Sequence, residues 1–154
     1  MANVDNPNGF RAIAPAGTTL PMYEYTTGSN VGLLPGDAVY LLTTGLLALG
    51  TATAAAILGV CQSIVTAETG VQKKALVIPA YKDIVFSGQC SGTFAQTDIG
   101  EAVDIEGTSG IMEINENATS LAVAQIVGIE GGIDNAVGAN TRVLFTWAKS
   151  QWTV

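Results

Sequence analysis

The sequence predicts an all-β fold, a small β-barrel or sandwich with an extended N-terminal arm and at most one short helix. Three observations predict it: short apolar runs follow one another after Gly36, 18 glycines punctuate the 154 residues, and four of the five prolines lie in the first 36 positions. Closely spaced strands separated by glycine turns are typical of sandwiches and barrels. A chain of this length is expected to fold as one domain with a sizeable core.

Residues 1–20 are expected to form the arm. Prolines at the density found there prevent a continuous helix and remove hydrogen-bond donors from a strand ladder. The arm is nevertheless partly apolar, because it contains Val4, Phe10, Ile13 and Leu20. We expect an arm of this kind to lie on a partner surface and to become ordered when it binds. The alternative is a frayed terminus.

Residues 21–154 are expected to form the β domain. Its strand-like runs are residues 39–43, 57–65, 74–78, 84–90, 121–130 and 142–149. In the last run Val143, Phe145 and Trp147 point to one face, and the alternate positions 144, 146 and 148 are also mostly apolar or small. This pattern predicts a strand that is covered on both sides.

For the alanine-rich segment 50–57 the sequence leaves two predictions open, a short helical turn or a strand-like conformation. Its alanines favour a short helical turn, but Thr51 and Thr53 interleave with them and both flanks are strand-like. Small side chains at this position would also let two backbones approach closely, as at a contact between subunits.

Residues 38–67 carry no charge but are not expected to span a membrane. Turn residues interrupt the run, and Asp37 and Glu68 flank it in place of a basic belt. Residues 1–9 are polar and do not have the pattern of a signal peptide, so synthesis in the cytoplasm is expected. There Cys61 and Cys90 would remain reduced core thiols, with a structural disulfide as the alternative.

The charge pattern excludes several classes of function. The net charge is −7, and only 12% of residues are charged. Histidine is absent, so Ser–His and Cys–His nucleophile pairs cannot form within one chain. The basic residues are scattered, so neither nucleic acid nor an anionic membrane is an expected partner. They are Arg11, Lys73, Lys74, Lys82, Arg142 and Lys149.

Acidic residues form the one dense cluster of titratable groups, at Asp98, Glu101, Asp104, Glu106, Glu113 and Glu116. We expect them to be solvated charges in glycine-rich loops, with divalent-cation binding and glycoside hydrolysis as the alternatives. No phosphate-binding loop and no Gly-x-Ser-x-Gly motif is present. We therefore expect no enzymatic activity, no cofactor and no metal.

Four segments carry a resemblance to a known family. They are Asn3-Val4-Asp5-Asn6-Pro7-Asn8-Gly9-Phe10, the run from Val77 to Phe86 with Gln89 after it, Asp98-Ile99-Gly100, and Thr141-Arg142-Val143-Leu144-Phe145. In order and spacing they resemble the capsid decoration (cement) proteins of tailed bacteriophages. Where members of that family often have an Asp-Pro pair, this chain has Ala80-Tyr81.

The resemblance implies a β-rich domain that forms homotrimers on the outer surface of an icosahedral head. Such trimers sit at threefold and quasi-threefold positions and tie neighbouring major capsid proteins together. On this reading residues 1–20 are a capsid-docking arm, residues 21–154 are the trimerisation domain, and the protein is made in the host cytoplasm and resides on the virion.

The capsid-facing contacts are expected in the arm, at Asn6, Pro7, Asn8, Gly9, Phe10 and Arg11. Phe10 would be the apolar anchor and Arg11 a charge-assisted donor, while Pro7 and Gly9 would set the backbone. Deletion of residues 1–11 is then expected to abolish capsid binding and to leave a folded trimer.

Three other readings remain open at this stage. A glycan- or receptor-binding module on a virion surface would use Trp147 and Trp152, the candidate exposed tryptophans. A hydrolase would use Asp98, Glu101 or Asp104. A tail or baseplate subunit would differ in symmetry, because tail rings are usually six-fold.

Overall fold

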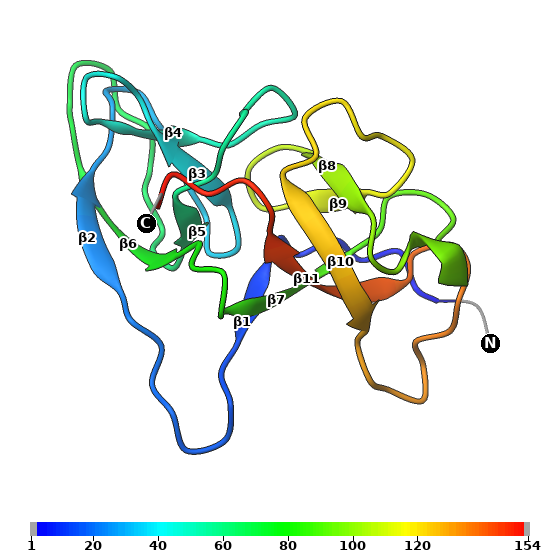
Figure 1. Cartoon of the computed structure of the whole chain (residues 1–154). Helices are drawn as coiled ribbons and strands as arrows, with labels where there is room; N and C mark the ends of the chain where they lie inside the picture. The colour runs from blue at the N-terminus through cyan, green and yellow to red at the C-terminus, as the bar shows by residue number, and fades with distance from the viewer. Residues whose placement is uncertain (1–2, 153–154) are drawn as a thin grey trace.

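A computed structural model describes residues 3–152 and confirms the all-β prediction. Two antiparallel sheets pack together in a sandwich-like arrangement without a closed barrel (Figure 1). The six-stranded sheet has the order β1 (Arg11–Ile13), β7 (Val85–Gln89), β11 (Arg142–Trp147), β10 (Ala124–Ile129), β8 (Ala102–Glu106) and β9 (Glu113–Asn115). The five-stranded sheet has the order β2 (Tyr23–Thr26), β6 (Lys74–Pro79), β5 (Gly59–Cys61), β3 (Ala38–Leu41) and β4 (Leu47–Leu49).

The chain enters the six-stranded sheet with β1, builds the five-stranded sheet with β2–β6, and returns for β7–β11. After β11 it runs back to the five-stranded sheet, where Ser150 forms a bridge to Ile57 (Figure 1). The five-stranded sheet is strongly curled, because Thr27, just beyond its edge strand β2, bridges to Leu47 in its other edge strand β4. Both ends of the described chain therefore tie the two sheets together.

Two buried clusters fill the fold. The larger one lies against the six-stranded sheet and includes the aromatic residues Phe86, Phe94, Phe145 and Trp147. The larger cluster also contains side chains from the five-stranded sheet, such as Val60, so it packs the two sheets against each other. The smaller cluster lies on the other side of the five-stranded sheet, under the paired loop residues Leu33 and Val65. Its members are Leu33, Val39, Leu47, Leu58, Cys61, Val65, Ala75 and Val77.

Strand β11 departs from the expected pattern on one face. Val143, Phe145 and Trp147 are buried as predicted, but Leu144 and Thr146 are only partly buried. The prediction that the strand is covered on both sides is therefore wrong. The small and apolar side chains on the second face of β11 belong to a surface of low polarity and do not form a second core layer.

The alanine-rich segment forms turns and no helix. Ala54 N donates to Thr51 O at 3.0 Å, and Ile57 N donates to Lys149 O at 3.0 Å. Pairing with the C-terminal segment therefore outweighs the helix propensity of the alanines. The only helical turn among residues 3–152 is a three-residue 3₁₀ turn at Gln96–Asp98.

The uncharged run 38–67 supplies β3, β4 and β5, of which β3 and β5 overlap the predicted runs 39–43 and 57–65. Within the part of the chain that is described, no helix is long and apolar enough to cross a membrane. Cys61 and Cys90 are both buried and free, which agrees with core thiols and not with a disulfide between them. Burial raises the pKa of both thiols above the ordinary value for cysteine.

The N-terminal segment divides into two parts. Residues 3–13 lie along their own six-stranded sheet, and Arg11–Ile13 form its edge strand against β7. Residues 14–19 are exposed and form a loop that projects between β1 and β2 (Figure 1). Residues 1 and 2 of the expected arm, and 153 and 154 of the expected domain, lie outside the described residues.

Candidate protein-binding surfaces

Side-chain hydrogen bonds hold the start of the chain on its own domain. Asn3 Nδ2 donates to Ala136 O at 2.7 Å, and Ala136 N donates to Asn3 Oδ1 at 2.9 Å. Further along, Asn6 N donates to Gln89 Oε1 at 3.0 Å, and Gln89 Nε2 donates to Asp5 Oδ1 at 2.9 Å. These reciprocal amide contacts fix the backbone path of the segment without any regular secondary structure.

Phe10 anchors the segment in the core of the same chain. Its side chain is 2% exposed, and its ring lies edge-on to the rings of Phe145 and Trp147 at centroid distances of 5.2 and 5.6 Å. Its backbone N donates to Gly36 O at 2.8 Å. The Phe10 ring is therefore packed in the core of its own chain, and it is not accessible to a partner protein.

Gly9 and Gly36 allow the segment to come close to the five-stranded half. Both have positive φ, +73° and +98°, a region that favours glycine. A Cβ on Gly9 would lie 2.6 Å from Gly36 O, and a Cβ on Gly36 would lie 2.7 Å from Asn8 O. Glycine is therefore required at position 9 both by the backbone conformation and by the lack of space for a side chain. Gly9 sets the local backbone, as expected.

The six residues expected to contact a capsid differ in exposure. Asn6, Asn8 and Arg11 are exposed, Pro7 and Gly9 are partly buried, and Phe10 is buried. All of them except Pro7 line one groove of about 440 Å³. The structure thus brings this set together on one surface, and whether a capsid binds there stays a prediction.

Two arginines and one glutamate dominate the charge of this groove. Arg11 and Arg142 both form ion pairs with Glu130, the latter through Nε at 3.2 Å from Oε2. The side chain of Glu130 is only 14% exposed, whereas those of Arg11 and Arg142 are 70% and 47% exposed. Among the residues that line the groove, two arginines therefore face one glutamate, while the carboxylates of Asp5 and Glu113 lie next to it because both accept from the lining residue Gln89.

Large exposed apolar side chains lie in the chain start and in the 131–139 loop, near the groove-lining residues Asn6 and Gly131 in sequence. Ile133 is 100% exposed, Val4 is 75% exposed and Val137 is 51% exposed. They lie near one another because Asn3 bonds to Ala136 and so holds the 131–139 loop beside the chain start (Figure 1). We call the groove together with these three side chains the N-terminal face. Sequence reasoning missed Ile133, although the preceding Gly131-Gly132 pair marks an exposed turn.

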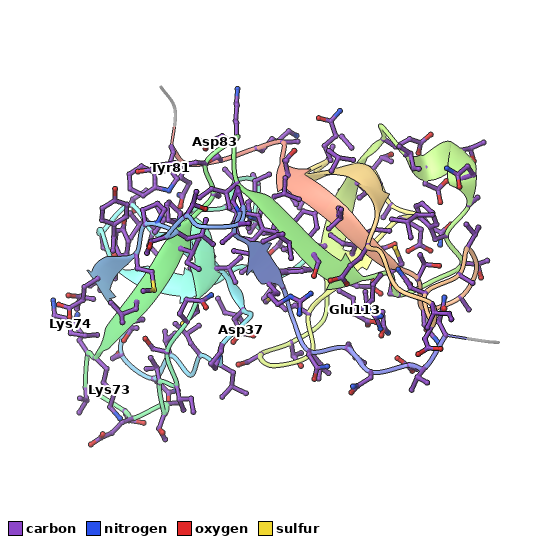
Figure 2. All side chains as sticks on the ribbon, turned by 90° about the horizontal axis from the view of Figure 1, so that it is seen from below. Asp37, Lys73, Lys74, Tyr81, Asp83 and Glu113 are labelled. Carbon is purple, nitrogen blue, oxygen red and sulfur yellow. The ribbon has the colours of Figure 1, made fainter. Side chains whose placement is uncertain are left out.

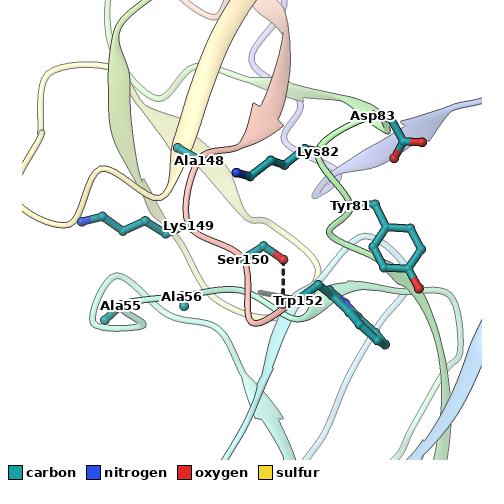
Figure 3. A pocket seen from close by; sticks show the side chains of 9 residues that line it. All are labelled: Ala55, Ala56, Tyr81, Lys82, Asp83, Ala148, Lys149, Ser150 and Trp152. Carbon is teal, nitrogen blue, oxygen red and sulfur yellow. Dashed lines mark hydrogen bonds between the residues drawn. The ribbon is translucent and has the colours of Figure 1, made fainter. Parts of the chain in front are cut away.

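A second cavity, of about 760 Å³, lies where the C-terminal segment passes the β6–β7 connection (Figure 3). It is lined by Ala55, Ala56, Tyr81, Lys82, Asp83, Ala148, Lys149, Ser150 and Trp152. The ring of Trp152 lies 5.1 Å from that of Tyr81 and 5.7 Å from that of Tyr23. Tyr81 donates to the Tyr23 hydroxyl at 3.3 Å, and this bond raises the pKa of Tyr81 to about 12. We call this the aromatic cavity.

Two members of the acidic cluster are structural rather than solvated. Asp104 is buried and accepts hydrogen bonds from Leu121 N and Ala122 N, both at 2.7 Å. Glu116 is buried and accepts one from Gly92 N at 3.3 Å. The expectation of solvated loop charges is therefore wrong for these two, because unpaired backbone N–H groups of the neighbouring loops recruit them.

Glu113 is the acidic residue with a displaced pKa. Partial burial raises the pKa of its carboxyl, and the nearby charges of Asp5, Glu106 and Glu116 raise it further, against a lowering contribution from the Gln89 hydrogen bond. Figure 2 shows Glu113 away from Lys73 and Lys74, which lie on the five-stranded half. Among residues 3–152, no group of three or more His, Cys, Asp or Glu side chains is arranged to hold a metal ion.

The two tryptophans expected for glycan binding are placed differently. Trp147 is 1% exposed and belongs to the core, so it is not a surface aromatic. Trp152 reaches the aromatic cavity, but its indole N–H is already donated to Leu58 O at 2.6 Å. No protein-family model, no curated protein and no solved structure matches this chain.

Proposed function

We propose that this chain is a structural decoration (cement) protein that binds the outside of a tailed-phage capsid as trimers at threefold and quasi-threefold sites. Its role is to hold neighbouring major capsid proteins together against internal DNA pressure. The observation that carries the proposal is Ile133, a fully exposed isoleucine of the N-terminal face, in the loop that Asn3 holds beside the chain start.

An exposed isoleucine flanked by a groove suits docking to another protein. Burying such a side chain contributes roughly 1.5–3 kcal/mol. Arg11 and Arg142 share a single carboxylate partner, so each keeps donors for an acidic group on the capsid. The apolar contact of Ile133 would supply most of the affinity, and the two arginines would orient the protein on the capsid.

The composition supports an outer and protein-covered location. A surface with few charges can be dried at an interface at low desolvation cost. The net charge of −7 disfavours contact with packaged DNA. Many copies on one shell would add avidity to modest individual contacts.

The experiment compares two isoleucines of similar exposure. Ile133 lies on the N-terminal face, and Ile64, which is 74% exposed, lies between β5 and β6 on the other sheet. Ile133→Asp is expected to lower the affinity for undecorated heads by about tenfold or more, since roughly 1.4 kcal/mol corresponds to a factor of ten. Ile64→Asp is the matched control and should leave occupancy unchanged. Equal occupancy for both variants and the wild type would remove the N-terminal face as the docking surface.

Point variants are preferable to the deletion of residues 1–11. That deletion removes Phe10 from the core and Arg11 from the edge strand β1, so loss of folding would accompany any loss of binding. Arg11→Gln removes one exposed charge, leaves Glu130 paired with Arg142, and tests the charged half of the same face.

A further inference from the structure

We infer that Tyr23 and Tyr81 form an oxidative cross-linking site, at which a one-electron oxidant joins the two rings as an intramolecular dityrosine. The inference concerns a covalent modification of this chain and does not depend on the proposed function. Three features carry it: the contact between the two hydroxyls, the fixed positions of the two backbones, and the access of an oxidant to both rings.

The hydroxyls of the two tyrosines meet although the residues are 58 positions apart in the chain. Their Oη atoms lie 3.3 Å from each other. In a dityrosine the new bond joins the ring carbons next to the hydroxyls, so the two oxygens of the product lie side by side. Tyr23 and Tyr81 therefore meet through the ends that are adjacent in the product. Among residues 3–152 no other two tyrosine hydroxyls share a hydrogen bond, although the chain contains four tyrosines.

The fold holds both backbones in place. Tyr23 begins β2, where it is paired with Val77 of β6. Tyr81 opens the turn between β6 and β7, in which Ile84 N donates to Tyr81 O at 3.1 Å. Rotation of the two side chains is then the only movement that coupling requires. Because both partners belong to one molecule, coupling between them is favoured over coupling between two molecules in dilute solution.

Trp152 packs against both rings and limits the positions that they can take. Its ring lies 5.1 Å from that of Tyr81 and 5.7 Å from that of Tyr23. The indole is itself held by its N–H, which donates to Leu58 O at 2.6 Å. Figure 3 shows the rings of Tyr81 and Trp152 next to each other at one side of the aromatic cavity.

An oxidant can reach the pair from solvent. Tyr23 is 43% exposed, and Tyr81 lines the aromatic cavity of about 760 Å³. Tyr25 and Tyr40 are also partly exposed, so the contact between the hydroxyls, rather than exposure, singles out the pair. The hydrogen bond with Tyr23 raises the pKa of Tyr81 to about 12, so the Tyr81 hydroxyl is protonated at neutral pH and its oxidation must release a proton with the electron.

The reaction balances with an oxidant that accepts two electrons in total. Each tyrosine loses one electron to the oxidant and its hydroxyl proton to water, which leaves two tyrosyl radicals. The radicals combine through one carbon–carbon bond between the ring carbons next to the oxygens. Each joined carbon then loses its hydrogen as a proton, and each oxygen takes up a proton to become a hydroxyl again. The net change is the loss of two electrons and two protons.

The bond would tie the edge strand β2 to the passage between the two sheets. The connection that contains Tyr81 runs from β6 in the five-stranded sheet to β7 in the six-stranded sheet. A cross-link between positions 23 and 81 restricts the unfolded chain, as a disulfide does. The cross-linked protein is therefore expected to unfold at a higher urea concentration than the untreated protein.

The test photo-oxidises the full chain at micromolar concentration with a tris(bipyridine)ruthenium complex and persulfate, which accepts two electrons and becomes two sulfate ions. The wild type should remain a monomer on a denaturing gel, lose two hydrogen atoms by mass spectrometry and gain dityrosine fluorescence. Trypsin should then release residues 12–73 joined to residues 75–82, and Tyr81 is the only tyrosine of the second peptide.

Four single variants assign the bond. Tyr23→Phe and Tyr81→Phe should each lower the yield of the joined peptides by about tenfold or more, because the positioned partner is lost. Tyr25→Phe, two positions along the same strand, and Tyr40→Phe are the matched controls and should keep the yield. Each variant removes one hydroxyl, and circular dichroism checks that it folds.

Several results would overturn the inference. They are an undiminished yield from Tyr23→Phe, no joined peptides from the wild type, and joined peptides found only in dimers. An equal yield from the wild type unfolded in concentrated urea would also overturn it, because the fold would then have no part in positioning the two rings.

Discussion

The ring of Phe10 lies edge-on to the ring of Phe145, with centroids 5.2 Å apart and planes at 74°. A residue from the start of the chain is thus part of the aromatic core of the six-stranded sheet. The N-terminal segment therefore stabilises the domain, and only its outward side chains are free to recognise a partner.

Phe10→Ala is expected to lower the free energy of unfolding by about 3–5 kcal/mol, because it removes a buried aromatic ring and leaves a cavity. Urea denaturation followed by tryptophan fluorescence measures this, since Trp147 lies beside the ring. Val4→Ala, at a side chain that is 75% exposed, should change stability by less than about 0.5 kcal/mol. Comparable effects of the two substitutions would contradict the placement of Phe10.

Gly36→Ala should destabilise more than Gly45→Ala. Both glycines have positive φ, so each alanine carries roughly 1–2 kcal/mol of backbone strain. Only at Gly36 would the new Cβ also meet backbone, at 2.7 Å from Asn8 O, whereas at Gly45 nothing lies within 4 Å. Thermal unfolding of the two variants separates steric clash from strain. Equal losses would show that the chain start does not pack against Gly36.

Asp37 links the two sheets through its carboxylate. Leu34 N donates to Oδ2 at 2.8 Å and Gly110 N to Oδ1 at 2.6 Å, and the Ser109 hydroxyl also donates to Oδ2. Asp37→Ala leaves three donors without their acceptor and is expected to cost about 2–4 kcal/mol, while Ser109→Ala removes one donor and costs about 1 kcal/mol. Chemical denaturation of both variants measures the difference. A loss from Asp37→Ala no larger than that from Ser109→Ala would exclude this carboxylate as a main tie between the halves.

Glu113 makes stability depend on pH in a defined direction. Its pKa in the folded protein is raised above the ordinary value of 4.5, mainly by burial. The folded state therefore binds a proton that the unfolded state has already released, and the wild type loses stability as pH rises from that ordinary value through the raised one. Glu113→Gln keeps an acceptor for Gln89 but cannot ionise.

The free energy of unfolding of Glu113→Gln should accordingly rise relative to that of the wild type as the pH increases from the ordinary value of 4.5 through the raised pKa of Glu113. Urea titrations at several pH values give both curves. Parallel curves across that interval would mean that Glu113 titrates alike in the folded and unfolded chains.

The fold class and most central strands could be predicted from the sequence, because alternating apolar runs and glycine turns are local signals. Strands β1, β2, β4, β8 and β9 could not, because these strands are short and their conformation depends on pairing, as when Arg11–Ile13 pair with residues 85–87 far along the chain. The alanine segment at 50–57 shows the same limit: its pairing with Lys149 overrides a local preference for helix.

The sequence could group the residues from Asn6 to Arg11, but it could not predict which of them are buried. All of these residues except Pro7 line one groove, but the burial of Phe10 depends on Phe145 and Trp147, more than 130 positions away, which no local pattern reports. Ile133 was missed for the converse reason, since a lone isoleucine in a glycine-rich loop gives no sign of whether it is covered.

We propose threefold and quasi-threefold positions on the outside of a phage head as the location of this protein. Electron cryomicroscopy of heads incubated with the wild-type protein or with Ile133→Asp tests it most directly. We expect trimeric density at those positions for the wild type, with the N-terminal face toward the capsid, and lost or much weaker density for the variant. Wild-type density in a six-fold tail ring, or none on the head, would contradict it.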